Sequence, residues 1–532
     1  MILINRSSIT NLLLIVLCVA MISGCQVAPL SSSDLDNDAS GDPTTSSTIL
    51  TGTISGLNLT DSTQTEIDFG DLDDDENILL VLYSSSGDTD SLGFELGDVS
   101  ESASPSYLTQ NPSLDATADF NDQLRQLEQG LNENPLENAQ PSTMRYATLG
   151  STRVFKVIDS TATTETYNLV TAELRVTSGE VNFYIDTRDA ASLDDADLEG
   201  LAAQFRVDEE RNLFGQESDV DGDGKIAVLF TRAVNELGGS SGGIITGFFY
   251  AIDLFDSSLY EASNEMEIFY TIVPDPAGDY GTAISKEFCL SNIHPSVLPH
   301  EYQHMINFNQ HYIVNGAGVE ESWLNEALSH LAEDMVNLNS AGYLEETNVE
   351  NPARVSSYLE DPNSLCLSCG TSLSQRGASY LFLRYLYEQA QLGHFAELTN
   401  GAEFLDLLVN SDLTGTDNLK AALFGSSSAD TEFKNSVGNF GLAVYFSNTN
   451  TTSDSVYEFQ GINLRSEQDD NRGTILNGPS IQTIASLPLT DTLSGISVSY
   501  LTISGQTIND QGGTLQLTIP SGAEIGGYVI RE

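Results

Sequence analysis

Short apolar runs separated by turn residues dominate residues 49–190 of this chain. Four of the runs have the length of a strand and lie at 78–84, 153–158, 168–176 and 181–186. Runs of this kind, bounded by Gly, Asn, Asp and Ser, are typical of β-strands. A polar stretch at 117–140 interrupts them and predicts a short helix followed by a loop.

Helical spacing replaces this pattern farther along the chain. Apolar positions recur every three or four residues in four segments, which indicates helices that bury one face. These segments are 198–205, 295–309, 318–336 and 379–389. Beyond about residue 440 the chain returns to strand-like runs between Gly, Asn and Ser turns. The latter runs are 441–447, 497–504, 513–520 and 526–531.

A chain of 532 residues is too long for a single core, so we predict a multidomain protein. The expected parts are a β-rich N-terminal region at 49–190, an α+β domain at 191–430 and a small C-terminal β-sandwich-like module at 431–532. No repeat with the period of a solenoid or propeller is present in the sequence.

The first 24 residues predict a signal peptide. They carry one charged side chain, Arg6, and an apolar run from Leu12 to Ile22 that is too short to span a membrane. The sequence Ile22-Ser23-Gly24-Cys25 resembles a bacterial lipobox, which implies that Cys25 is lipidated. Residues 25–48 then form a polar tether, and the protein is a lipoprotein of the bacterial cell envelope, at the outer membrane or cell surface. The alternative is a buried apolar helix.

The charge balance excludes nucleic acid as a partner. The chain has 20 Lys and Arg against 77 Asp and Glu, a formal charge of -57 that repels phosphates and anionic lipid surfaces. We therefore expect contact with a membrane through the N-terminal lipid only. Three cysteines follow Cys25: Cys289, Cys366 and Cys369. We expect one disulfide involving Cys366 or Cys369 and one leftover thiol, with the pairing left open.

The segment with the clearest chemistry is His300-Glu301-Tyr302-Gln303-His304. Helical residues four apart lie on one face, so both imidazoles can bind one cation, with Glu301 beside the open coordination position. Five of the six histidines fall within 37 residues, unlike scattered surface histidines; they are His294, His300, His304, His311 and His330. We predict that His300 and His304 bind zinc and that Glu301 is the general base.

A second amphipathic helix, expected at 318–336, supplies the third ligand. It carries Glu326, and it can pack antiparallel to the first helix. A His, His, Glu set with one open position is the arrangement of catalytic zinc. His330 lies four residues after Glu326 on the same face and competes for the metal. We choose Glu326, and place His330 beside the ring of His300 or His304, where its neutral imidazole can accept or donate one hydrogen bond that supports the ligands.

These residues resemble a known class of enzymes. The HExxH motif followed by Asn325-Glu326-Ala-Leu-Ser329 is similar to the gluzincin pattern of thermolysin-like peptidases. The segments PHEYQHMINF and SWLNEALSHLAED are more similar still to the hyicolysin-type neutral zinc peptidases, and this similarity extends over about residues 180–400. The resemblance implies a zincin-like catalytic domain and hydrolysis of peptide bonds in proteins. His330 stands where the thermolysin pattern has an Asp that orients the first His.

The resemblance also suggests a donor for the oxyanion of the reaction. A tyrosine on a helix after the third ligand plays this part in related gluzincins, which favours Tyr380. The other candidates are His311, Tyr312, His330 and Tyr385. A tyrosine in an aromatic helical stripe more commonly packs in a core, so a packing role for Tyr380 is the competing interpretation.

A second cation site is expected at an acidic turn. Asp219, Asp221 and Asp223, followed by Gly224, match the opening half of an EF-hand loop that binds calcium. Phe230 occupies position twelve, where a Glu would be expected, so we predict a structural calcium turn outside the EF-hand family. The alternative is a solvated acidic turn. The acidic run at 71–76 is read as a charged loop.

Three functions compete. We predict a zinc metalloendopeptidase that acts on extracellular or periplasmic proteins. An aminopeptidase is the nearest alternative, although residues 263–267 carry the Glu and Met of the corresponding exopeptidase motif in the wrong order. A calcium-stabilised adhesin or binding lipoprotein is the alternative from another class, and the intact set of His300, Glu301, His304 and Glu326 argues against it.

Overall fold

The computed structural model describes residues 53–57, 59, 64–70, 72–73, 75–87, 91–97, 116–133, 147–159, 166–238, 243–335, 338–344, 351–449, 451–465 and 474–532. The predicted signal peptide 1–24, Cys25 and the tether 25–48 lie outside them, as do Asp71 and Asp74 of the acidic run. None of the helices in these described ranges has the length and apolarity that a membrane span requires.

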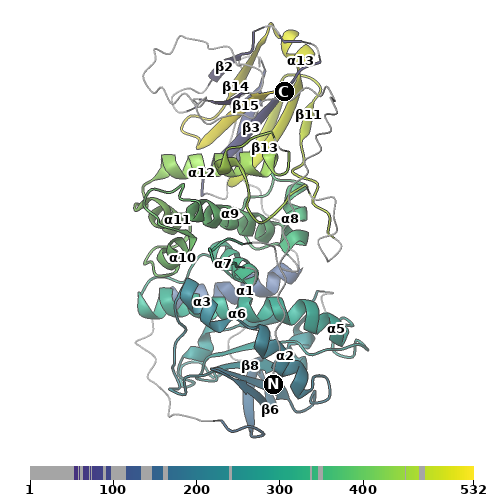
Figure 1. Cartoon of the computed structure of the whole chain (residues 1–532), viewed down its shortest axis with the longest axis vertical. Helices are drawn as coiled ribbons and strands as arrows, with labels where there is room; N and C mark the ends of the chain where they lie inside the picture. The colour runs from purple at the N-terminus through teal and green to yellow at the C-terminus, as the bar shows by residue number, and fades with distance from the viewer. Residues whose placement is uncertain are drawn as a thin grey trace, which may run out of the picture.

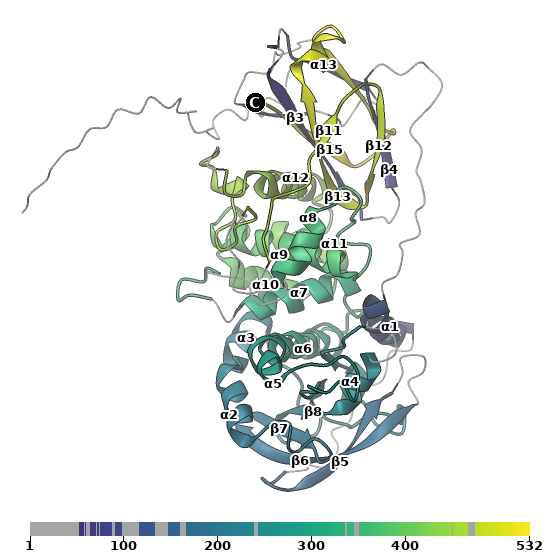
Figure 2. The same ribbon diagram turned by 90° about the vertical axis from the view of Figure 1, so that its right-hand side faces the viewer.

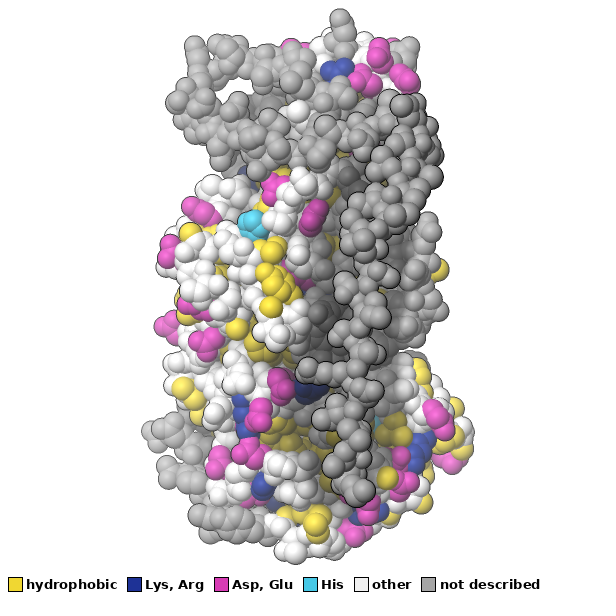
Figure 3. Space-filling view, in the orientation of Figure 1, with side chains coloured by type: hydrophobic (Ala, Val, Ile, Leu, Met, Phe, Trp, Pro, Cys, Tyr) yellow, Lys and Arg dark blue, Asp and Glu magenta, His cyan; other side chains and the backbone are white. Residues whose placement is uncertain are grey.

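The elements stack along the long axis of an elongated molecule (Figure 1). A β module that holds the C-terminus lies at one end, a helical layer lies in the middle, and a second sheet lies at the other end (Figures 1 and 2). Asp and Glu side chains are spread over the face in Figure 3 rather than gathered in one patch. This scatter is consistent with a solvated acidic surface.

The sheet at the lower end of Figure 1 has six strands in the order β5-β6-β7-β8-β10-β9. They are β5 (Thr152–Ile158), β6 (Tyr167–Ser178), β7 (Val181–Asp186), β8 (Ile226–Phe230), β9 (Gly247–Phe249) and β10 (Ile268–Thr271). β8 runs parallel to β7 and β10, and the other neighbours are antiparallel. β7, β8 and β10 are buried along their whole length, as expected for apolar strands covered on both faces.

Three long helices connect this sheet to the rest of the molecule. α6 (His294–Phe308) contacts the edge strand β9, α7 (Ser322–Asp334) packs on α6, and α9 (Leu373–Gln391) packs on α7. The remaining α-helices are α1 (Ala116–Gln129), α2 (Asp195–Gln204), α3 (Val207–Phe214), α4 (Arg232–Gly238), α5 (Lys286–Phe288), α8 (Asn351–Leu359), α10 (Gly401–Val409), α11 (Gly415–Phe424), α12 (Asp430–Phe446) and α13 (Gly505–Asn509). The helices expected from the apolar spacing are confirmed as α2, α6, α7 and α9.

The β module contains strands from both ends of the chain. One sheet has the order β1-β15-β3-β13-β11 and the other β12-β4-β14-β2. Its strands are β1 (Ile54–Gly56), β2 (Gln64–Asp68), β3 (Asn77–Ser85), β4 (Ser91–Leu96), β11 (Gln482–Ile484), β12 (Leu489–Ser494), β13 (Ile496–Ser504), β14 (Thr514–Thr518) and β15 (Ile525–Arg531). The expected N-terminal region 49–190 is therefore divided, because β1–β4 join the C-terminal strands while β5–β7 belong to the six-stranded sheet.

The expected strand at 441–447 is wrong, because these residues lie in and just after α12. α12 packs on β3 of the β module, and its glycines allow a close approach. A Cβ atom on Gly438 would lie 2.5 Å from the Tyr83 ring, and one on Gly441 would lie 2.9 Å from Val498. The apolar run is buried by helix-to-sheet packing, so its strand-like composition does not decide its structure.

The cysteine expectation is confirmed in outline. Cys366 and Cys369 form a disulfide with each other, and Cys289 is a buried free thiol. The pairing that the sequence left open is therefore local, within the segment that precedes α9.

Candidate metal centre

Two helices position the predicted zinc ligands. α6 carries His300 and His304, and α7 carries Glu326, in the contact between the two helices. The side chains are 8%, 2% and 1% exposed, respectively. Pro299 lies inside α6 rather than in its first turn, and π-helical turns flank α6 at Cys289–Ile293 and Asn309–Val314.

The three side chains point at one another. Nε2 of His300 lies 3.5 Å from Oε2 of Glu326, and Nε2 of His304 lies 3.6 Å from Oε1. Ligands about 2.0–2.2 Å from a tetrahedral zinc are separated by about 3.3–3.6 Å, so these spacings fit the ion. Oε2 of Glu326 is buried and is shared between His300 and the Arg376 guanidinium, which lies 3.1 Å away. Glu326 thus points toward both histidine nitrogens, the orientation that the predicted ligand set requires.

Hydrogen bonds fix the His304 ring. Its Nδ1 lies 2.9 Å from Oδ1 of Asn325 and 3.0 Å from Oγ of Ser329, which donates to Gln303. Because the Asn325 oxygen can only accept, Nδ1 carries the proton and Nε2 is left with a lone pair facing Glu326. Asn325 and Ser329 are the flanking residues of the NExxS pattern, so they have a physical role as orienting groups.

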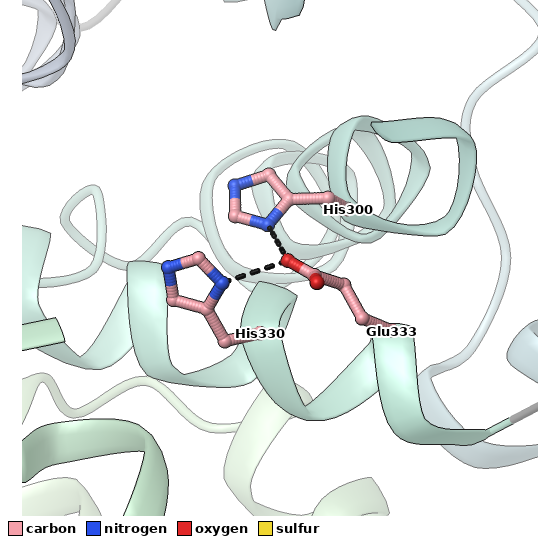
Figure 4. Close-up of side chains that lie close together, drawn as sticks. All are labelled: His300, His330 and Glu333. Carbon is pink, nitrogen blue, oxygen red and sulfur yellow. Dashed lines mark hydrogen bonds and ion pairs between the residues drawn. The ribbon is translucent and has the colours of Figure 1, made fainter. Parts of the chain in front are cut away.

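Glu333 fixes the His300 ring, and the sequence did not identify it. Its Oε1 accepts from Nδ1 of His300 at 3.0 Å and from Nδ1 of His330 at 2.7 Å (Figure 4). The rings of His300 and His330 lie 4.7 Å apart. His330 therefore lies beside His300 as expected, but its hydrogen bond goes to Glu333. Glu333 follows Glu326 by seven residues, two helical turns on the same face, and this spacing is the signal that could have revealed it.

The electrostatics favour a cation between these groups. Burial alone would raise the pKa of Glu326, but Arg376 and the two histidines hold it well below its usual value. Burial would likewise raise the pKa of Glu333, and its histidine neighbours hold it well below normal. Burial lowers the pKa of His304 far below its usual value, so this ring is neutral and able to bind a metal.

Glu301 lines a cavity beside the metal centre. The cavity walls are formed by Thr246, Gly247, Ile293, Ser296, Val297, His300, Glu301, His330, Glu333, Arg354 and Arg376. Oε2 of Glu301 accepts from the Phe249 N–H at 2.8 Å, and burial raises the pKa of this carboxyl. A Cβ atom on Gly247 would lie 2.5 Å from Val297 and 2.7 Å from the Tyr270 carbonyl, so this wall requires glycine.

α1, predicted only as a short helix, supports β9, whose Phe249 N–H donates to Glu301. Arg125 donates to the Phe249 carbonyl at 3.0 Å and to Glu128 at 2.7 Å. Glu128 in turn accepts from the Ala251 N–H at 3.1 Å. The end of β9 is therefore held on both sides, which fixes the N–H that Glu301 accepts from.

Arg376 is a further cavity residue that the sequence did not identify. It comes from α9, and its Nη1 lies 3.1 Å from Oε2 of Glu326. Its Nη2 is buried and has no hydrogen-bond partner among the described residues. No spacing rule connects Arg376 to the HExxH motif, because the contact is made by helix packing.

The placement of Tyr380 contradicts its expected role. Its hydroxyl donates to Asp334, which also pairs with Arg384 at 2.6 Å. Asp334 lies eight residues beyond Glu326, about 12 Å along α7, and Tyr380 does not line the cavity. Tyr380 therefore belongs to a buried network with Asp334 and Arg384, which favours the packing interpretation.

The other proposed donors are also engaged elsewhere, apart from His330. His311 lies 3.1 Å from the Leu408 carbonyl, and Tyr312 donates to the Leu131 carbonyl at 3.2 Å. Tyr385 donates to the Val456 carbonyl at 2.8 Å. These hydroxyl and ring groups hold distant parts of the chain together and do not line the cavity.

The acidic turn is partly as expected. Asp219 and Asp221 each offer an oxygen to one cluster, but the third member of that cluster is Glu267 rather than Asp223. Oδ1 of Asp223 instead accepts from the Lys225 N–H at 2.7 Å.

The arrangement as a whole defines a class of site: two histidines and a glutamate that can hold one metal ion, next to a cavity lined by a buried carboxylate. No family model matches the sequence. A stretch of 190 residues is 30% identical to the neutral metalloprotease ShpI of Staphylococcus hyicus, covering 34% of this chain and 39% of that protein. The chain thus matches well under half of the relative's length. This partial similarity supports a peptidase.

Proposed function

We propose that this chain is a zinc-dependent endopeptidase. The observation that carries the proposal is the convergence of His300, His304 and Glu326 at spacings that fit zinc, with Glu301 in the adjoining cavity. The partial similarity to a neutral metalloprotease supports the same chemistry. A zinc ion bound there would supply a Lewis acid that polarises the scissile carbonyl and acidifies water.

The chain's own residues supply the proton transfer. Glu301 accepts the proton of the attacking water and returns it to the leaving amine. The Phe249 N–H holds one carboxylate oxygen in place. Burial raises the pKa of Glu301, which brings that pKa closer to neutral pH. Arg376 lines the same cavity with an unpartnered Nη2, so it can donate to a substrate carbonyl, the part that Tyr380 was expected to play.

The test replaces Glu301 with Gln. Glutamine keeps the shape and can still accept from Phe249, but it cannot take up and return a proton. We expect Glu301→Gln to retain about one zinc per chain by elemental analysis and to lose at least 100-fold in casein hydrolysis. The matched control is Glu287→Gln, an exposed position on α5, which should keep full activity. Near-normal turnover by Glu301→Gln would refute the mechanism.

A peptide substrate blocked at both ends separates the competing functions. An endopeptidase cleaves it, an aminopeptidase requires the free amine, and a binding lipoprotein cleaves neither form. Zinc dependence is measured by loss of cleavage with 1,10-phenanthroline and recovery on adding zinc. Lipid attachment at Cys25, with placement in the bacterial cell envelope, is part of the proposal on sequence grounds; retention of a Cys25→Ser variant in the membrane fraction would contradict it.

A further inference from the structure

A tight acidic turn precedes β8 and is held by its own side chains. Oδ1 of Asp219 accepts from the Gly224 N–H at 2.9 Å, and Oδ1 of Asp221 accepts from the Asp223 N–H at 3.1 Å. Gly222 and Gly224 have φ values of 69° and 65°, so the turn relies on glycine at both positions.

Glu267 reaches this turn from a distant part of the chain. It immediately precedes β10, and it is 1% exposed. Its Oε1 accepts from the Ser218 hydroxyl at 2.5 Å and from the Val220 N–H at 2.9 Å. One oxygen each from Asp219, Asp221 and Glu267 lies within 4.8 Å of the other two.

Two buried oxygens in this cluster have no hydrogen-bond donor. Oε2 of Glu267 and Oδ2 of Asp221, itself on a side chain 1% exposed, are both buried and unpartnered among the described residues. Buried carboxylate oxygens are costly unless paired or bound to a metal. Of the nearby basic side chains, Lys225 points away to the Gly179 carbonyl at 2.8 Å, and Arg153 supplies one positive charge near Asp221. Asp223 adds a fourth carboxyl next to Asp221, so this cluster carries an excess of negative charge that a divalent cation would reduce.

We propose that Asp219, Asp221 and Glu267 form a calcium site. An all-oxygen ligand set favours a hard cation over zinc, and a loop with several carboxylates suits the large, adaptable coordination sphere of calcium better than that of magnesium. Glu267 takes the place of the glutamate that an EF-hand loop would carry at position twelve, where this chain has Phe230. The site lies outside the zinc centre and extends beyond the proposed peptidase function.

The site joins the turn to the strand pair that supports Glu301. Phe269, two residues after Glu267, is paired with Phe249 between β10 and β9, and the Phe249 N–H donates to Glu301. Calcium bound at Glu267 therefore restrains the start of β10 close to the support of the general base. This second step rests on the proposed peptidase function, whereas binding of calcium does not.

Binding is tested without any activity assay. The thermal unfolding of the full mature chain is measured in a buffer freed of calcium and magnesium, with zinc held saturating. Calcium chloride or magnesium chloride is then added in increasing amounts. Calcium at about 100 times its dissociation constant should raise the melting temperature by about 2–5 °C, with magnesium much less effective. Titration calorimetry should give one calcium per chain. Indifference of the melting temperature to 10 mM calcium overturns the site, whether or not the protein is a peptidase.

Three variants identify the ligands. Glu267→Gln keeps the acceptor for Ser218 and Val220 but loses the charge, so it should abolish the calcium-induced shift. Asp223→Asn should keep the shift, because Asp223 lies outside the cluster, and Glu199→Gln, an exposed position on α2, is the control. The assignment of Glu267 as a ligand is overturned if Glu267→Gln keeps the normal calcium-induced shift of the melting temperature. It is also overturned if Asp223→Asn loses that shift while Glu267→Gln keeps it. For the second step, casein hydrolysis at constant zinc should fall several-fold on calcium removal, and an unchanged rate refutes only that step.

Discussion

Glu333 offers the sharpest test of how the metal centre is held. Its Oε1 accepts from Nδ1 of both His300 and His330, and its side chain is almost wholly buried. These bonds fix the His300 ring with Nε2 toward Glu326, and the negative charge makes that ring a better metal ligand. Replacing Glu333 with Gln preserves the shape and one acceptor but removes the charge.

The size of the effect follows from these bonds. A hydrogen bond to a charged group contributes about 1.5–3 kcal/mol, and every 1.4 kcal/mol changes an equilibrium constant tenfold. If that stabilisation is lost from the zinc-bound state, Glu333→Gln binds zinc about 10–100 times more weakly. The activity at saturating zinc should fall less, because Glu301 and its contact with Phe249 are unchanged.

The assay is competition for zinc against a chromogenic chelator, combined with kcat/KM for a blocked peptide at saturating zinc. Glu320→Gln is the matched control: Glu320 is equally buried and lies just before α7 on the same segment as Glu326, but it accepts from the Gly415 N–H and from Asn418 rather than from a histidine of the metal centre. It should lose stability without losing zinc affinity. A zinc affinity of Glu333→Gln within twofold of the parent would refute the orienting role, and so would an equal loss in Glu320→Gln.

Two further predictions concern residues outside the zinc ligands. Tyr380→Phe should keep kcat within about threefold and lower the free energy of unfolding by about 1–2 kcal/mol, because the Tyr380 hydroxyl donates to Asp334 and does not line the cavity. A 100-fold fall in kcat with normal zinc content would instead support the role of Tyr380 as oxyanion donor. Burial raises the pKa of Asp253 to about 7, so its neutral form is favoured in the folded chain and its contribution to stability is lost as pH rises from about 4 to 7. Chemical denaturation of Asp253→Asn should therefore show a shallower decline of stability over that range than the parent, and parallel curves would contradict the prediction.

The side chains of the proposed zinc site could be brought together from the sequence because their relation is largely local. His300 and His304 are four apart on one helix, and Glu326 lies on the helix that follows, so periodicity alone brings the three together. Asn325 and Ser329 were recognised as part of a motif, and the structure adds the physical reason, which is their contact with His304.

The residues that sequence reasoning missed or misplaced depend on packing between distant segments. Arg376 reaches Glu326 because α9 crosses α7, and Tyr380, one helical turn further on, is carried away from the site by the same crossing. Glu267 reaches the acidic turn across parallel strands, a contact that the local EF-hand comparison could not contain. In each case the residue type was compatible with several roles, and only the packing selected one.

The division of the predicted N-terminal region 49–190 between two sheets also follows from non-local pairing. β3 pairs with β13 and β15, more than 400 residues later, so the β module closes only when both ends of the chain are present. The first described residue, Thr53, directly precedes β1, which pairs with β15, so this end of the described chain lies at the β module. With Cys25 lipidated as proposed, the 28 residues from Cys25 to Thr53 span at most about 100 Å when fully extended. With a lipidated Cys25, a tether of that reach would let the metal centre between α6 and α7 stand away from the lipid surface and meet soluble protein substrates.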